Sequence, residues 1–154
     1  MRNLLKLIKK FILYKNKDKL LILKICVLTG IFRMLILYVP FKKLKMYMGE
    51  LNKESSKDIT HYQYNEACRI RWAIEKVVKY TPWESKCLVQ SLTAQYLLSQ
   101  KKIDSTLYLG VAMDKKEGLK KDFIAHSWIR CGGFFVTGGN GDKFATVAKF
   151  RKSF

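Results

Sequence analysis

Cys87 and His126 are the two residues of this sequence whose types and surroundings could together do chemistry. Cys87 stands in the first turn of a predicted helix, directly after the segment 82–86. The N-terminus of a helix carries about half a positive charge, and with the neighbouring Lys86 it favours a thiolate over a thiol. His126 follows on a predicted strand. A thiolate beside an imidazole is a nucleophile and base pair, which is typical of acyl transfer.

A third group is needed to orient the imidazole, and the sequence leaves its identity open. If Gly132 and Gly133 form a two-residue hairpin turn, His126 pairs opposite Gly139, where no carboxylate stands. The candidates near that position are Asp142, Asn140 and Thr137. We prefer Asp142 because a charge stabilises an imidazolium better than an amide does, although an amide serves in papain-like sites.

Both residues also have an ordinary structural interpretation. A lone cysteine is usually a small apolar side chain of the core, and a lone histidine at a strand edge is usually a satisfied polar group. The position of Cys87 at a helix start favours the chemical interpretation. His126 is the only histidine in the predicted sheet region, and Trp128, on the same strand face, would shield it from water.

The composition restricts the class of protein. The chain has 154 residues, 49% of them hydrophobic, which fits one packed domain or a small domain with a helical appendage. Thirty Lys and Arg residues against twelve Asp and Glu give a net charge of +18, most concentrated in residues 1–57. Such a charge attracts anionic membranes, nucleic acid or acidic partners. No nucleic-acid-binding module is recognisable, so nucleic acid is not expected as a partner.

The cysteines indicate neither a metal site nor a disulfide framework. Four cysteines are far apart, with no C-x-x-C pair and no zinc spacing, and we expect no metal and no cofactor. Lysines at 6, 9 and 10 break the first apolar run, and no small-residue cleavage site follows it. The predicted location is therefore the cytoplasm, with free thiols.

The N-terminal part of the chain is predicted to be helical and apolar. Residues 3–14 show the pattern of an amphipathic helix, which would lie on an anionic membrane or on a protein core. After a polar break at 16–19, the apolar run 20–39 is long enough to span a bilayer. Lys24 and Arg33 interrupt it from opposite sides, so a buried or interfacial helix is favoured over a span. Membrane association through these helices stays open.

The remainder is predicted to be a compact domain of the α+β class. A short basic helix over 42–49 and a polar linker over 53–60 come before it, and we place the boundary between 1–57 and 58–154. The predicted helices span 64–80 and, from an N-cap at Ser85, the residues up to about 100. The predicted strands span 106–113, 123–131, 134–137 and 144–150. Helices followed by an antiparallel sheet would pack the helix that bears Cys87 on that sheet.

Several stretches together resemble a known family. They are 39–41, 83–92, 109–111, 125–129, 136–139 and 144–150. The combination of Cys-Leu-x-x-Ser-Leu from Cys87 with His-x-Trp from His126 is similar to the transglutaminase-like protease domain of lasso-peptide maturation proteins. The resemblance implies a Cys, His and Asp triad, of which Cys87 and His126 match, whereas the aspartate's strand position falls near Gly138.

The resemblance also implies a function and partners. The protein would be the stand-alone leader peptidase of a split pair, cutting a ribosomally made precursor whose leader is held by a separate recognition protein. An ATP-dependent cyclase would then close the macrolactam ring. Three alternatives stay open: a catalytically idle scaffold that binds the precursor or the cyclase, a basic protein that binds membranes or nucleic acid, and transamidation, in which an amine resolves the thioester.

Overall fold

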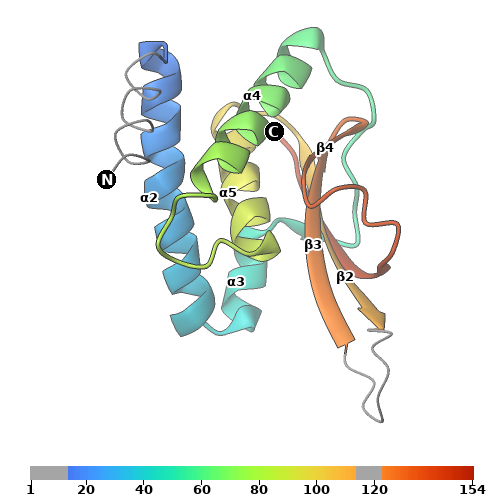
Figure 1. The fold of residues 1–154 in the computed structure, drawn as a ribbon. Coiled ribbons are helices and arrows are strands. Elements are labelled where there is room, and N and C mark those ends of the chain that lie inside the picture. Colours follow the sequence, from blue (N-terminus) through green and yellow to red (C-terminus); the bar gives the residue numbers. More distant parts are fainter. Residues whose placement is uncertain (1–13, 114–122) are drawn as a thin grey trace.

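The computed structural model of the chain describes residues 14–113 and 123–154 (Figure 1). Its elements are α2 (Asn16–Tyr38), α3 (Phe41–Tyr47), β1 (Glu50–Leu51), α4 (His61–Val77), α5 (Cys87–Gln100), β2 (Ser105–Met113), β3 (Phe123–Cys131), β4 (Phe134–Thr137) and β5 (Ala145–Lys152). Two predicted segments lie outside the described residues: the helix predicted over 3–14, except for residue 14, and the loop predicted over 114–121.

The fold is a helical layer packed on one antiparallel sheet, which confirms the predicted α+β class. The strand order is β1-β5-β2-β3-β4, and every neighbouring pair is antiparallel. Figure 1 shows α2, α4 and α5 on one side of the sheet, with α5 next to the strands. The main core lies between these layers and draws buried side chains from α2, α4, α5, β3 and β4. Helix α5 is therefore held from both sides.

Helix α2 begins earlier than predicted. Residues 16–19, expected as a polar break, form its first turn, in which the carbonyl of Lys15 accepts from the backbone N–H groups of Asp18 and Lys19. The Asp18 carboxylate lies 2.9 Å from Arg69 of α4, and this contact fixes the turn to the domain. The helix ends at Tyr38, and Val39, which precedes Pro40, is extended, as the residue before a proline usually is.

The two charged residues in the apolar part of α2, Lys24 and Arg33, flank its buried side. Ile25 and Thr29 are buried against the domain, whereas Lys24 bonds to Gln100 and Arg33 lies 2.9 Å from Glu84. By length and composition α2 could cross a membrane or serve as a signal sequence, and core helices pass the same test. In this structure one side of α2 packs on α4 and α5.

Helix α4 and the sheet edge also differ from expectation. Thr60 and Gln63 form a reciprocal capping box, so α4 begins at His61 rather than at the predicted residue 64. Strand β1 was not predicted, and it pairs Glu50 with Arg151 of β5. Because β5 pairs with β1 on one side and β2 on the other, it continues to Lys152, two residues beyond its predicted end.

Candidate active site

Cys87 is the first residue of α5, which confirms its predicted place at a helix start. Its thiol is partly buried, and as the first helical residue its backbone N–H has no acceptor within the helix. The predicted N-cap is wrong: Lys86 occupies the N-cap position without a side-chain bond. The Ser85 hydroxyl instead bonds Thr81 at 3.1 Å, and its carbonyl accepts from the Gln90 side chain at 2.7 Å.

Lys86 is not a free positive charge beside the thiol. Its ammonium lies 3.1 Å from Glu84, and the same carboxylate contacts Arg33 of α2. Hydrogen bonding to Lys86 is the main reason that the pKa of Glu84 lies below its usual range. The helix start is therefore the feature that distinguishes the surroundings of Cys87, and the Lys86 part of the sequence argument is weakened.

Helix α2 holds the loop that leads to Cys87. The indole Nε1 of Trp83 donates to the buried hydroxyl of Thr29 at 3.2 Å. The same ring packs against Gly30, where a Cβ would come within 3.3 Å of it. With the Arg33 contact to Glu84, these bonds fix the loop from the side opposite the sheet. The N-terminal helix thus contributes to the position of the candidate nucleophile.

His126 lies on β3, opposite Gly110 of β2. Its Nε2 is 2.7 Å from the backbone carbonyl oxygen of Gly138. Because a carbonyl oxygen only accepts, this bond places the proton on Nε2 and leaves Nδ1 of the neutral ring unprotonated. A base needs such a free nitrogen, and the Gly138 carbonyl fixes which of the two it is.

Aromatic rings enclose the imidazole. His126 stacks on Phe144 at 4.6 Å between centroids and on Trp128 at 6.0 Å, and Tyr108 stacks on Trp128 at 5.4 Å. Gly110 makes room for this row, since a Cβ there would lie 2.8 Å from Trp128. The prediction that Trp128 shares the face of His126 is confirmed, and the row restricts the ring's motion.

Three buried hydroxyls connect α5 to the strands around His126. Ser91 bonds Thr137 at 3.1 Å, and Ser127 donates to Ser91 at 3.2 Å. Ser91 stands one helical turn after Cys87, Ser127 is next to His126, and Thr137 comes directly before the glycine that binds the ring. The three hydroxyls therefore hold the first turns of α5 against the face of β3 that Ser127 presents. Because neighbouring strand residues point to opposite faces, the rings of His126 and Trp128 lie on the other face of the sheet.

The hairpin register was predicted only in part. The turn at Gly132 and Gly133 is confirmed, and Cys131 pairs with Phe134 as expected. An irregularity between Ile129 and Arg130 then shifts the pairing by one residue, so that Ile129 pairs with Thr137. The predicted position of His126 opposite Gly139 is therefore wrong. Strand β4 ends at Thr137, and the chain turns so that the Gly138 carbonyl meets the ring.

The three candidate orienting side chains have other partners in this structure. Asp142 and Asn140 are exposed and bond each other, and Thr137 bonds Ser91. The group that sequence reasoning missed is a backbone carbonyl, which no residue type reveals. Ser91 and Ser127 were also missed, although both lie within the motifs that suggested the site, as hydroxyls at otherwise core-facing positions.

Among residues 14–113 and 123–154, no group of three or more His, Cys, Asp or Glu side chains is placed to hold a metal ion. The four cysteines are free thiols. Cys131 is buried, and this burial raises the pKa of its thiol to about 11. It is an ordinary core residue.

Comparison with protein-family models gives a match to the transglutaminase-like superfamily over residues 35–150. The chain belongs to this superfamily. Its members are typically cysteine peptidases or transglutaminases, in agreement with a thiol at the start of a helix packed on an antiparallel sheet. No curated protein and no solved structure matched the chain.

Proposed function

We propose that this transglutaminase-like protein is a cysteine peptidase that removes the leader from a ribosomally made precursor of the lasso-peptide type. The observation that carries the proposal is the bond from His126 to the Gly138 carbonyl, which leaves Nδ1 available as a base. The superfamily match supports the class of nucleophile, since its members are typically cysteine peptidases or transglutaminases. The mechanism requires the His126 ring to reach the α5 side of β3, because Ser127 rather than His126 faces Ser91 in this structure. The sequence resemblance supports the substrate class.

The mechanism follows from these groups. Nδ1 of the neutral His126 ring takes the proton of the Cys87 thiol. The resulting thiolate attacks the scissile carbonyl carbon, and the backbone N–H of Cys87 donates to the oxyanion that forms. Nδ1 of the His126 imidazolium protonates the leaving amine as the C–N bond breaks, which leaves an acyl thioester. Nδ1 then accepts a proton from water, whose oxygen displaces the thiolate and releases the leader as a carboxylic acid. Throughout, Nε2–H remains bonded to Gly138.

Partners and location are part of the same proposal. A separate recognition protein would hold the leader, and an ATP-dependent macrolactam cyclase would use the amine that cleavage frees. Both reactions belong in the cytoplasm, where the precursor is made. The free thiols of the four cysteines are compatible with that compartment.

The direct test is cleavage of a precursor peptide of the lasso type, to be sought among the neighbouring genes, with its recognition protein present and mass spectrometry as readout. We expect Cys87→Ala and His126→Ala each to lower the rate by a factor of about 1,000 or more. Cys68→Ala is the matched control, because Cys68 is also a partly buried free thiol but lies on α4. Rates of Cys87→Ala or His126→Ala within a few-fold of the unchanged protein would refute the proposal.

A second candidate is a scaffold that binds the precursor or cyclase without cutting. The observation that favours it is the pairing of Asp142 with Asn140, which leaves a neutral carbonyl as the recorded partner of His126. Iodoacetamide at pH 6 separates the two functions: a peptidase nucleophile should react faster than the other three cysteines, whereas a scaffold should show no preference. Adding a primary amine to the cleavage assay and searching for its adduct tests transamidation.

A further inference from the structure

The outward side of α2 is an apolar surface that nothing in the described chain covers. Seven side chains form it at helical spacing, each between 47% and 75% exposed: Leu20, Leu23, Val27, Ile31, Met34, Leu37 and Tyr38. We call these seven residues the α2 stripe. It lies on the side of the helix opposite the buried Ile25 and Thr29, and none of its members is charged. Large exposed apolar patches on soluble domains usually mark contact sites.

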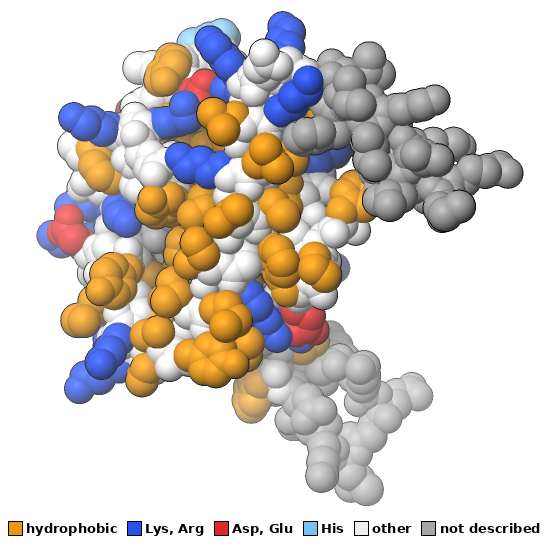
Figure 2. Space-filling view, turned by 90° about the vertical axis from the view of Figure 1, so that its left-hand side faces the viewer, with side chains coloured by type: hydrophobic (Ala, Val, Ile, Leu, Met, Phe, Trp, Pro, Cys, Tyr) orange, Lys and Arg blue, Asp and Glu red, His pale blue; other side chains and the backbone are white. Residues whose placement is uncertain are grey.

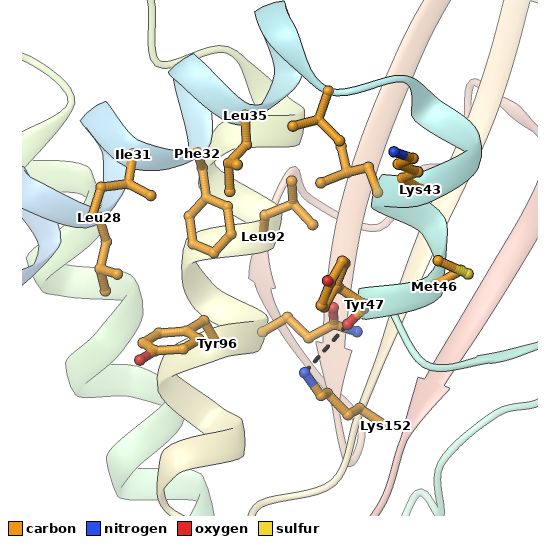
Figure 3. Close-up of a pocket in the computed structure, with 13 residues that line it drawn as sticks. Leu28, Ile31, Phe32, Leu35, Lys43, Met46, Tyr47, Leu92, Tyr96 and Lys152 are labelled. Atoms are coloured by element: carbon orange, nitrogen blue, oxygen red, sulfur yellow. Dashed lines mark hydrogen bonds between the residues drawn. The ribbon is translucent and has the colours of Figure 1, made fainter.

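Helix α3 extends the same surface. Its Phe41, Met46 and Tyr47 are 50%, 70% and 72% exposed. Between α2, α3 and α5 lies an apolar groove of about 560 Å³, lined by residues such as Ile31 of the stripe and Tyr47 of α3 (Figure 3). The groove is therefore a recessed apolar surface next to the α2 stripe. It lies on the α2 side of α5, whereas Ser91 faces the strands.

The charge around this surface is mostly positive. Exposed lysines on or next to the two helices are Lys15, Lys17, Lys24, Lys42, Lys43 and Lys45. Residues 14–48 contain a single acidic residue, Asp18, and it contacts Arg69. Figure 2, which looks onto this side of the molecule, shows hydrophobic side chains across the face with Lys and Arg around them. An apolar stripe with a basic border complements an anionic lipid surface.

We infer that the α2 stripe and α3 dock this protein on an anionic membrane, with α2 lying in the plane of the interface. A second copy fits this surface less well, because a symmetric contact would bring two sets of lysines together. Crossing the bilayer would withdraw Ile25 and Thr29 from the core and separate Arg33 from Glu84. Lying flat keeps those contacts, and a helix of 23 residues then offers about 35 Å of apolar side chains to the lipid.

The test is flotation of the full chain with two kinds of vesicle, phosphatidylcholine alone and phosphatidylcholine with about one third phosphatidylglycerol. We expect binding to the anionic vesicles only, weakened by added salt. Replacing Lys42, Lys43 and Lys45 together by Gln should weaken binding on the order of 100-fold, at about fivefold for each charge. Failure of the unchanged chain to bind anionic vesicles would overturn the inference.

Two valines provide a matched pair for the apolar contribution. Val27 of the stripe is 61% exposed and Val147 of β5 is 60% exposed, so aspartate at either site should cost the fold little. Val27→Asp should lower vesicle binding by about tenfold or more, and Val147→Asp should leave it unchanged. Equal binding by both variants would contradict the inference, with circular dichroism confirming that each is folded.

Sedimentation of the same samples tests the alternative that a second copy of the chain covers the α2 stripe. A dimer that Val27→Asp dissociates, with no vesicle binding by the unchanged chain, would assign the surface to a second copy and refute the lipid contact. Cys87→Ala should bind vesicles like the unchanged chain. Vesicle binding and precursor cleavage can therefore fail independently.

Discussion

The imidazole Nε2 of His126 and the carbonyl oxygen of Gly138 are 2.7 Å apart, and this bond decides which ring nitrogen can act as a base. A carbonyl fixes the tautomer as a carboxylate would, but it brings no negative charge to stabilise the imidazolium. The orientation of the ring therefore depends on backbone geometry at Gly138, where φ is +75°.

Gly138→Ala should disable the site while Gly139→Ala should not. Both glycines have positive φ, +75° and +67°, so both variants carry a similar backbone strain of about 1 kcal/mol. A Cβ at Gly138 would lie 2.3 Å from the carbonyl oxygen of Ser127, whereas one at Gly139 meets nothing within 4 Å. We expect kcat for precursor cleavage to fall by about 100-fold or more for Gly138→Ala only. Similar kcat values for the two variants would contradict the role of this carbonyl.

Asp142→Asn distinguishes the predicted triad of Cys87, His126 and Asp142 from a site in which the Gly138 carbonyl orients His126. The Asp142 side chain is exposed and bonds Asn140, so its charge should contribute little to the imidazolium. We expect kcat/KM for cleavage within a factor of about three of the unchanged protein, with the same pH profile. A loss of about 100-fold or more would restore Asp142 as the third member, through a rearrangement on substrate binding.

Ser91→Ala tests the hydroxyl contacts between α5 and the strands. It leaves the buried hydroxyls of Ser127 and Thr137 without this partner, which should cost about 1–2 kcal/mol of unfolding free energy. If the contacts position Cys87, kcat should fall by more than KM rises. Thr93→Val is the control: Thr93 is equally buried on α5, but its hydroxyl bonds the carbonyl of Val89 in the same helix. An unchanged kcat in Ser91→Ala would limit the contacts to stability.

Local patterns in the sequence were sufficient for most elements. Strands β3 and β4 have their predicted bounds because alternation and the Gly132-Gly133 turn are both local signals. The start of α4 was predicted three residues too late, although Thr60 and Gln63 have the spacing of a capping box. Strand β1 was not predicted, because two residues show no periodicity and their pairing partner lies a hundred positions away.

The candidate site was predictable only as far as side chains define it. Cys87 at a helix start and Trp128 beside His126 follow from spacing. The one-residue shift between Ile129 and Arg130 does not, and this shift changed which group the ring meets. A main-chain acceptor placed by an irregular hairpin has no signature in residue type.

Glu50 should make stability depend on pH at the sheet edge. Hydrogen bonds from Lys53 and then Arg151 hold the pKa of Glu50 at about 2, below its ordinary value of 4.5. A depressed pKa means stability that is present above pH 4.5 and lost as the pH falls toward 2. As the pH falls over this range, the urea midpoint should therefore fall less steeply in Glu50→Gln than in the unchanged protein. This difference between the two proteins should shrink in high salt.

Glu75→Gln, which removes an exposed glutamate paired with Arg71 on α4, is the control. Identical slopes for all three proteins would show that the edge contacts contribute nothing.

Trp83→Phe tests whether α2 positions the loop before Cys87. The substitution removes the N–H that donates to Thr29, at a cost of about 1 kcal/mol, and it also removes the outer edge of the indole that packs against Gly30. Because this bond fixes the loop rather than touching substrate, kcat should fall several-fold with little change in KM. Trp72→Phe on α4 loses an indole N–H away from the loop and should leave kcat unchanged. A double mutant gives the sharper criterion. Arg33→Gln removes the contact to Glu84 in the same loop. If α2 acts only by holding this loop, adding Arg33→Gln to Trp83→Phe should lower kcat little further. Fully additive losses in kcat would mean that the two contacts act separately, and that α2 does not hold the loop as one unit.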